Sequence, residues 1–240
     1  MKPIYLFLFT VAVFNSSFAQ TGKVISDPNS SMRKVDAFHG IFIEDGIDLY
    51  LTQGKEQAVA ISANKIEYRD KIITKVVNGV LRISYGSENG FYITWRDRKL
   101  KAYISVKDID ALTASGGSDV IVEGIVTTNN LKINLSGGSD FTGELNANEF
   151  FISLSGGSDG RVKGTATNLK VTASGGSDFL GYDLQAEFAI VEASGGSDAH
   201  LNVSKEIFAE ASGGSDIDYK GNPIIKRNSS SGGGSVTKRN

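Results

Sequence analysis

The residues of this sequence that could do chemistry recur in one short motif. The pentapeptide SGGSD occurs six times, beginning first at Ser115, and an imperfect seventh copy, SGGGS, begins at Ser231. Carboxylate oxygens at a glycine-rich corner of a coiled sheet are ligands that Ca²⁺ prefers. We therefore consider calcium as a cofactor held by the six aspartates that close the motif: Asp119, Asp140, Asp159, Asp178, Asp198 and Asp216.

A structural role for the motif, without any cofactor, is the competing interpretation. Calcium-binding nonapeptide repeats have a much shorter period, whereas successive copies here begin 18 to 21 residues apart. Glycines adopt the positive-φ conformations that a tight corner needs, and serine and aspartate side chains satisfy its backbone N–H groups. Water and counterions would screen the row of like charges. Calcium binding and a solvated corner both stay open.

A second candidate site is the aromatic and basic stretch GFYITWRDRKLK at 90–101, which contains the single tryptophan. Exposed aromatic and arginine side chains commonly anchor protein or glycan partners. Alternation along part of the stretch is typical of a strand, which would bury some of the rings. We expect a partner-binding patch formed by Phe91, Tyr92, Trp95, Arg96 and Arg98.

The sequence offers little support for catalysis. The only histidines are His39 and His200, which we expect at the surface, and a serine repeated in every copy is a poor candidate for a unique nucleophile. The enzymatic alternative is a polysaccharide lyase or hydrolase, because parallel β-helices host such enzymes and their sites cluster charged residues. Asp159, Arg161 and Lys163 form the one mixed cluster within a repeat. We interpret it as an ordinary solvated face and predict no enzyme.

Charge argues against nucleic acid as a partner of the repeats. Residues 113–225 carry six basic and fifteen acidic groups, a net charge of −9 that would repel phosphate backbones. Residues 20–112 have a net charge of +2, and residues 226–240 one of +4. The chain has no cysteine, so burial and backbone hydrogen bonds must stabilise it without disulfides.

The elements that position the motif follow from aligning its copies. In all six, the residue before the motif and the residue two further back are apolar, and the residue between them is polar. A period of two is typical of a strand with one buried face, and a period near 20 residues is typical of a solenoid. We predict an all-β parallel β-helix or solenoid over residues 113–225, with rungs of about 19–20 residues that pair in parallel about 4.8 Å apart.

Residues 33–112 lack the motif but are also rich in strand patterns. FHGIFIEDGIDLYLTQG alternates around Ile41, Ile43, Ile47, Leu49 and Leu51. An asparagine–glycine pair at 78–79 predicts a hairpin, and a helical turn is expected near residues 65–71. Further strands are predicted at 58–63, 72–77, 80–85 and 100–106. We interpret this β-rich half as less regular rungs of the same stack.

The two ends of the chain differ from the middle. Residues 1–19 combine a positive charge, an apolar run too short for a membrane anchor, and small residues before Gln20, which is typical of an export signal. We predict a signal peptide over these residues, a linker over 20–32 and no transmembrane segment in the mature chain. Residues 226–240 are interpreted as a degenerate last rung and basic tail whose cations discourage further strand pairing.

The order of these segments resembles a known family. RKVDAFHGIFIEDGIDLYLTQG, then VVNGVLRISY, then LKAYISVKDIDALTASGGSD and its repeats are similar to the DUF2807 family, described as the "putative auto-transporter adhesin head domain" of exported Bacteroidota proteins. The resemblance covers about residues 33–225. It implies a right-handed β-helix-like fold, an exported location and no established biochemical activity, and it contributes no catalytic residues.

Together these observations predict an exported, non-enzymatic β-solenoid that acts as an adhesin-like structural or interaction module at the cell envelope. Its partner would be a glycan or an envelope protein, and its location the periplasm, the outer surface or the extracellular space. The alternatives are a calcium-binding solenoid and a polysaccharide-active β-helix enzyme.

Overall fold

The computed structural model describes residues 27–86 and 98–240, so the predicted signal peptide lies outside the described residues. The one helix within them, α1 (Ile66–Arg69), is far too short to cross a membrane. The strands of the described part are β1 (Ser31–Met32), β2 (Gly40–Ile43), β3 (Asp48–Gln53), β4 (Ala58–Ser62), β5 (Ile72–Val77), β6 (Val80–Tyr85), β7 (Lys101–Val106), β8 (Ala111–Ala114), β9 (Val120–Ser136), β10 (Phe141–Ser155), β11 (Gly160–Gly175), β12 (Phe179–Gly195), β13 (Asp198–Gly213), β14 (Asp216–Lys220), β15 (Ile224–Ser230) and β16 (Ser235–Lys238).

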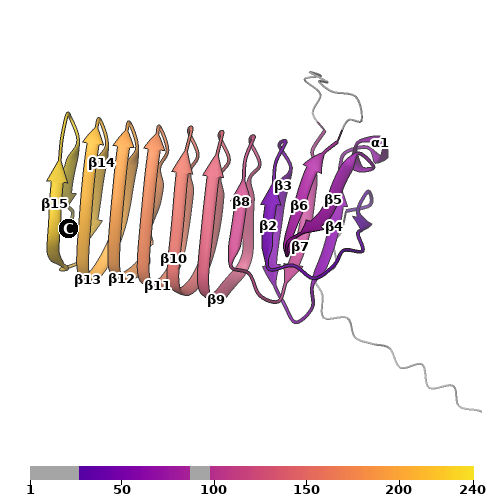
Figure 1. Ribbon diagram of the computed structural model, residues 1–240, viewed down its shortest axis with the longest axis horizontal. Helices are drawn as coiled ribbons and strands as arrows, with labels where there is room; N and C mark the ends of the chain where they lie inside the picture. The colour runs from indigo at the N-terminus through magenta and orange to yellow at the C-terminus, as the bar shows by residue number, and fades with distance from the viewer. Residues whose placement is uncertain (1–26, 87–97) are drawn as a thin grey trace, which may run out of the picture.

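These strands form a solenoid, which Figure 1 shows as a row of rungs running from β15 at the C-terminal end to α1 at the other. One ladder of strands runs β7-β3-β9-β10-β11-β12-β13-β14-β16, and a second runs β6-β2-β8-β9 and onward to β13-β15. The first half of each long strand lies in one ladder and its second half in the other. Pairing is parallel, and Phe141 faces Gly160, 19 residues on. The predicted solenoid is therefore confirmed.

The core is built from the columns that the sequence pattern predicts. A residue of one rung packs over the equivalent residue of the next, so each column buries its own members. The residue before the motif is at most 3% exposed in all six copies, and so is the residue two further back. Each fully buried Leu, Ile, Val or Phe contributes about 1.5–3 kcal/mol to folding, which a chain without disulfides needs.

The first half of the chain supplies the rungs at the other end of the stack, in an order that the sequence did not reveal. All four strands predicted there are present, as are the helical turn and the hairpin, whose Asn78 and Gly79 have φ of 51° and 74°. The rung formed by β2 and β3 lies between the rung of β6 and β7 and that of β8 and β9. The chain therefore forms the second rung of the stack first, with β2 and β3, and forms the outermost rung later, with β6 and β7.

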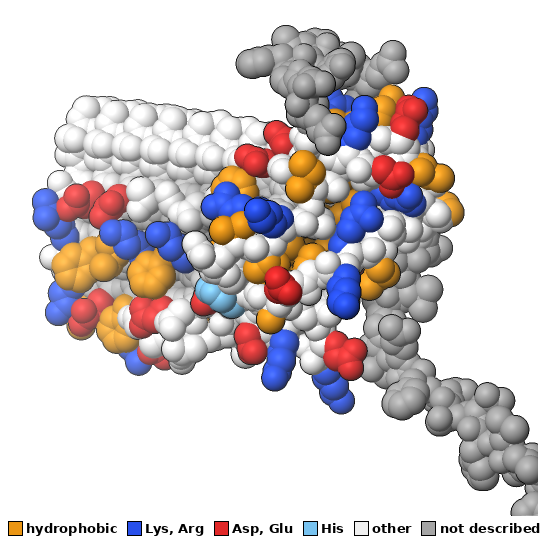
Figure 2. Space-filling view, turned by 45° about the vertical axis from the view of Figure 1, so that its right-hand side comes forward, with side chains coloured by type: hydrophobic (Ala, Val, Ile, Leu, Met, Phe, Trp, Pro, Cys, Tyr) orange, Lys and Arg blue, Asp and Glu red, His pale blue; other side chains and the backbone are white. Residues whose placement is uncertain are grey.

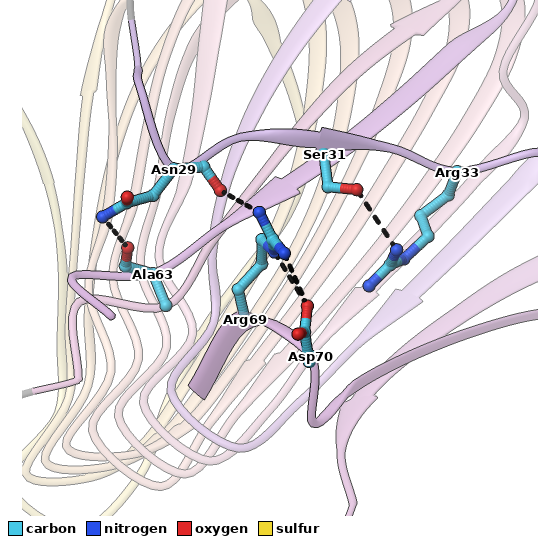
Figure 3. Close-up of polar contacts among 6 residues, drawn as sticks. All are labelled: Asn29, Ser31, Arg33, Ala63, Arg69 and Asp70. Carbon is cyan, nitrogen blue, oxygen red and sulfur yellow. Dashed lines mark hydrogen bonds and ion pairs between the residues drawn. The ribbon is translucent and has the colours of Figure 1, made fainter. Parts of the chain in front are cut away.

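Antiparallel strands close this N-terminal end. β4 pairs antiparallel with β7, and β1 with β4. Figure 3 shows how the entering chain is fixed: the Asn29 amide donates to the Ala63 carbonyl oxygen at 3.1 Å, and the Arg69 guanidinium donates to the Asn29 carbonyl at 3.1 Å and to the Asp70 carboxylate at 2.8 Å. Ser31 and Met32, which the sequence placed in a linker, form β1 because their backbone completes the free edge of β4.

The imperfect motif copy SGGGS forms the corner of a last rung. The Ser231 N–H donates to the Ala211 carbonyl at 3.0 Å, and the Ser235 N–H to the Ser215 carbonyl at 3.0 Å. β15 pairs with β13, and β16 with β14, both in parallel. These pairings place β15 and β16 in a rung that follows the six SGGSD copies.

The two glycines of one motif copy should respond differently to substitution. Gly175 has φ of 84°, and a Cβ there would lie 3.2 Å from the Gly156 nitrogen of the rung below, whereas Gly176 lies outside the positive-φ region and has open space around its Cβ position. We expect G175A to lower the free energy of unfolding by about 1–2 kcal/mol and G176A to change it by less than about 0.5 kcal/mol. Urea denaturation of the two variants checks this, and equal effects would contradict the corner geometry.

Candidate functional site

The SGGSD motif forms the corner between the two ladders, as the sequence predicts. The first glycine of all seven copies has φ between 65° and 84°, so each corner needs the left-handed conformation that glycine adopts without strain. The second glycine is left-handed only in the first three copies, at Gly117, Gly138 and Gly157. The corners therefore share one conformation at their first glycine and vary at their second.

The second serine of the motif is a buried connector between rungs. All six of these serines are 0% exposed. The N–H of Ser139 donates to the hydroxyl oxygen of Ser158 on the next rung at 3.1 Å, and the N–H of Ser158 donates to Ser177 in the same way. The pattern begins at the Ile47 N–H, which donates to Ser118, and extends to Ser197. A buried N–H without such a partner is costly, so these serines are structural.

The aspartates form a second ladder that runs in the opposite direction. The N–H of each motif aspartate from the second to the sixth donates to the carboxylate Oδ1 of the motif aspartate on the rung before it, at 3.0–3.3 Å. The Ser235 hydroxyl ends the series by donating to Asp216 at 2.7 Å. The expectation that the side chains of the motif satisfy corner N–H groups is confirmed, and the six aspartates lie in one row.

A further corner, at residues 44–48, escaped the sequence analysis. The segment EDGID connects β2 to β3 and lies beneath the first SGGSD copy, since the Ile47 N–H donates to the Ser118 hydroxyl at 3.1 Å. Asp45 and Gly46 have φ of 68° and 69°, as the two glycines of the first copy do. Asp48 takes the position of the motif aspartate. The shared glycine and final aspartate, following an alternating strand, were the available signal.

Burial, together with the neighbouring charges, raises the pKa of two carboxyls in this row. Burial raises the pKa of the Asp48 carboxyl, and the neighbouring charge of Asp119 raises it further, against the opposing effect of the Asp119 N–H hydrogen bond. Burial also raises the pKa of Asp159, to which the flanking Asp140 and Asp178 add. Repulsion along the ladder therefore opposes the hydrogen bonds that the same carboxylates accept.

The corner geometry determines which carboxylate oxygens are available to a calcium ion. One oxygen of each of the first five motif aspartates accepts a backbone N–H, which leaves the second oxygen for other partners. Within residues 27–86 and 98–240, no three His, Cys, Asp or Glu side chains converge as a metal site. Calcium coordination by the ladder stays a prediction.

Most of the predicted aromatic patch falls outside the described residues: Phe91, Tyr92, Trp95 and Arg96. Arg98 is described, and its guanidinium lies over the Tyr85 ring, 4.4 Å from the centroid. Arg98 also lines a cavity of about 480 Å³ together with Asp45, Asp48, Lys99 and Lys101. The patch as a partner-binding surface stays a prediction.

The second ladder has an outward column that the sequence analysis did not consider. It lies four residues before each motif copy from the second to the seventh, and we call it the outer column: Lys132, Phe151, Lys170, Ile190, Phe208 and Arg227. Phe151, Ile190 and Phe208 are 39%, 46% and 41% exposed. Large apolar side chains gathered on an exposed face are typical of contact surfaces. Alignment of the motif copies at this position would have revealed it.

Ion pairs surround the apolar members of the outer column. Lys170 pairs with Glu192 at 3.5 Å, Lys205 with Glu187 at 2.6 Å, and Arg227 with Glu210 at 2.7 Å. Figure 2 shows apolar side chains interspersed with basic and acidic ones on the side of the strand stack. An apolar centre with a charged rim is the usual anatomy of a protein-binding surface.

The residues considered for catalysis lie at or near the surface. His39 is exposed, with Nδ1 2.8 Å from the Asp110 carboxylate, and the His200 ring stacks on Tyr182 with centroids 4.9 Å apart. Arg161 and Lys163 are exposed on β11. The Oδ1 atom of Asp159, the acidic member of that cluster, accepts the Asp178 N–H at 3.2 Å.

Comparisons with known proteins agree with the fold. The family model DUF2807, "Putative auto-transporter adhesin, head GIN domain", matches residues 37–223. A comparison with curated proteins finds no match. The crystal structure of a "putative adhesin" from Bacteroides fragilis is similar with a TM-score of 0.80 and 24% identity, over 88% of this chain and 96% of that one.

Two structures from Parabacteroides distasonis are also similar. A "putative adhesin" has a TM-score of 0.68 and 18% identity, over 88% of this chain and 96% of that one. A "putative lipid binding protein" has a TM-score of 0.64 and 21% identity, over 89% of this chain and 98% of that one. At these identities the likeness supports the fold alone.

Removal of one ladder serine should destabilise the solenoid. S158A leaves the buried Ser139 N–H without an acceptor, and we expect the free energy of unfolding to fall by about 1–3 kcal/mol. S153A, at an outward position of the neighbouring strand β10, is the matched control and should be nearly silent. Urea denaturation measures both, and equal stability of the two variants would show that the serine ladder does not stabilise the fold.

The repulsion at the start of the aspartate row should appear in the pH dependence of stability. The ionised form of a carboxyl with a raised pKa in the folded state opposes folding, and this contribution fades as the pH falls through that pKa toward 3.8. We therefore expect D48N to unfold at higher urea concentration than the wild type at pH 7, with a difference that shrinks as the pH approaches 4. The exposed D36N variant is the control. A D48N advantage that is constant with pH would contradict the assignment.

Proposed function

This chain belongs to the DUF2807 family, described as "Putative auto-transporter adhesin, head GIN domain", and from that premise we propose that it is an exported, non-enzymatic module that binds a partner at the cell envelope. The observation that carries the proposal is the outer column, with its three half-exposed apolar side chains on a rigid sheet. The apolar run and small residues of positions 1–19 support export.

The outer column supports binding because its apolar members would gain from contact. Phe151, Ile190 and Phe208 retain about two fifths of their surface in water. Covering this surface would contribute on the order of 1 kcal/mol for each side chain. The flanking strands of the sheet hold the three residues in fixed register, so a partner would order few groups on binding. Ion pairs at the rim add specificity more than affinity.

The proposed partner is an envelope protein, with an envelope glycan as the second candidate. The ion pairs around Ile190 and Phe208 favour a protein, because protein interfaces combine an apolar centre with charged rims. A glycan is favoured by the aromatic rings of the outer column and by amide and carboxylate side chains beside it, such as the Asn168 amide that donates to Glu149 at 2.6 Å. Both kinds of partner use the same face.

Binding in place of turnover is part of the proposal. The mixed cluster of Asp159, Arg161 and Lys163 was the enzymatic alternative, and the exposure of both basic residues together with the hydrogen bond to Asp159 supports a solvated face. The His39–Asp110 pair is exposed on both sides, at 57% and 54%, and water competes strongly with chemistry at such a position.

Substitution of the apolar outer column should weaken partner binding. We expect the combined variant F151S/I190T/F208S of residues 20–240 to bind an isolated Bacteroidales envelope fraction on the order of 10- to 100-fold more weakly than the wild type. The melting temperature should change little, since lysines occupy the same column at two other rungs. The control is I125T, which alters a 48% exposed isoleucine outside the outer column.

Quantitative pull-down and biolayer interferometry measure the difference, before and after protease treatment of the envelope fraction. Loss of binding after protease identifies a protein partner, and retained binding directs the search to a glycan array. Undiminished binding of the combined variant would contradict the role of the outer column. Product release from a polysaccharide panel, abolished by substitution of Arg161, would contradict a non-enzymatic role.

A further inference from the structure

The two ends of the solenoid are finished differently. At the N-terminal end the terminal strands are antiparallel and their core-facing residues are covered, since Ile61 of β4 is 0% exposed and Ile72 of β5 is 3% exposed, whereas Met32 of β1 and Ile73 of β5 face outward and are 65% and 50% exposed. At the C-terminal end the last strands are parallel. Within the described residues β15 pairs only with β13, and β16 only with β14. One edge of each terminal strand is therefore open.

The hydrophobic core is also open at this end. Ile225 continues a column in which the preceding members, Leu131, Phe150, Leu169, Ala189 and Ile207, are at most 4% exposed. Ile225 itself is 50% exposed, because no described rung lies over it. Its neighbour Ile224 is 62% exposed. An apolar residue above Ile225 would complete the column as it is completed in every earlier rung.

Backbone groups of β15 also point toward the open side. The Ser231 N–H donates inward to the Ala211 carbonyl. Because the N–H and C=O groups of successive strand residues alternate in direction, those of Ser230 and Asn228 point away from the stack. Such an edge is a template for one more strand.

The basic residues of the last rung do not lie across this edge. The sequence suggested that they discourage further pairing, but they contact the rung before them. Lys226 pairs with Glu206 at 3.3 Å, Arg227 with Glu210 at 2.7 Å, and Arg239 with Asp218 at 2.8 Å. The Lys238 ammonium donates to the Asn222 side-chain oxygen at 2.6 Å. The cations thus line the sides of the edge and leave its backbone groups accessible.

Charge selects the strand that would fit. Residues 226–240 contain four basic and no acidic residues, whereas residues 113–225 have a net charge of −9. Each terminal arginine already has an acidic partner below it, so an acidic residue above it would place the cation between two carboxylates. A second copy of the same end would instead bring four further cations against these four. The complementary occupant is an acidic strand of another protein.

We propose that the open C-terminal rung is a strand-addition site for an extended segment of a partner protein in which apolar and acidic residues alternate. The backbone of β15 would supply the hydrogen bonds, Ile225 would receive an apolar side chain, and Lys226 and Arg227 would select acidic ones. This site shares only Arg227 with the outer column, whose apolar members Phe151, Ile190 and Phe208 lie on earlier rungs, so either proposal can fail without the other.

Synthetic peptides test the proposal directly. The probe is a fluorescein-labelled octapeptide that alternates valine with glutamate, compared with one that alternates valine with lysine. We expect residues 20–240 to bind the acidic peptide at least tenfold more tightly in fluorescence anisotropy, with affinity that falls as salt rises. Equal binding of the two peptides would overturn the proposal, as would binding of neither.

Two variants locate the binding. N228P removes an outward N–H from β15 without a change of charge, and it should reduce binding of the acidic peptide at least tenfold. K226E/R227E should shift the preference to the basic peptide, and it keeps the test decisive if proline unfolds the last rung. K75E on β5, at the opposite end, is the matched control and should bind as the wild type does.

Three outcomes would overturn the site. They are unchanged binding by both variants, loss of binding in K75E, and concentration-dependent dimerisation of the wild type that N228P abolishes. Analytical ultracentrifugation measures the last of these, which would identify a second copy as the occupant.

Discussion

The structure depends on the hydrogen bonds that run along the solenoid axis from one corner to the next. The N–H of the buried serine donates toward the following rung in the first four SGGSD copies, and the N–H of the aspartate donates toward the preceding rung in the last five. A slip of one residue would break both ladders and turn every buried strand side chain outward. Such slips are the common failure of parallel strands with similar sequences, and the motif opposes them at every rung. A chain without disulfides gains its single register in this way.

Fixed register turns every position of the repeat into a column, and the columns differ in what they tolerate. Inward columns accept only apolar residues, and the corner accepts only side chains that complete its hydrogen bonds. Outward columns have neither constraint, so they are where one rung can differ from the next. The outer column changes from Lys132 to Phe151 to Lys170 while the corner beside it stays the same. Recognition is therefore to be sought in the columns that vary, since the constant motif is explained by folding.

The sequence predicts those parts of the structure that follow from period alone. The strands, the parallel stacking, the buried columns and the corner all repeat, and each repeat adds evidence. The features that the sequence did not reveal are those that depart from the repeat period. Ile47 replaces the buried serine in the EDGID corner because its side chain fills the core while its backbone N–H still reaches the Ser118 hydroxyl. The swapped rung order depends on the antiparallel pairing of β4 with β7 and of β5 with β6, which no local pattern encodes. The contacts of Arg227 with the preceding rung likewise require the register to be known first.

The choice of aspartate at the corner has a second physical consequence. Asparagine offers the same oxygen to the N–H of the next rung, so the hydrogen bond alone does not require a charge. Burial raises the pKa of the Asp159 carboxyl, and the charges of Asp140 and Asp178 raise it further, so repulsion between neighbouring carboxylates opposes the ladder there. In return, the row gives one long edge of the solenoid a continuous negative charge, so two solenoids that approach side by side at this edge repel. The basic last rung has the opposite sign. The same charge pattern that opposes lateral association therefore favours contact between the end of the coil and an acidic partner.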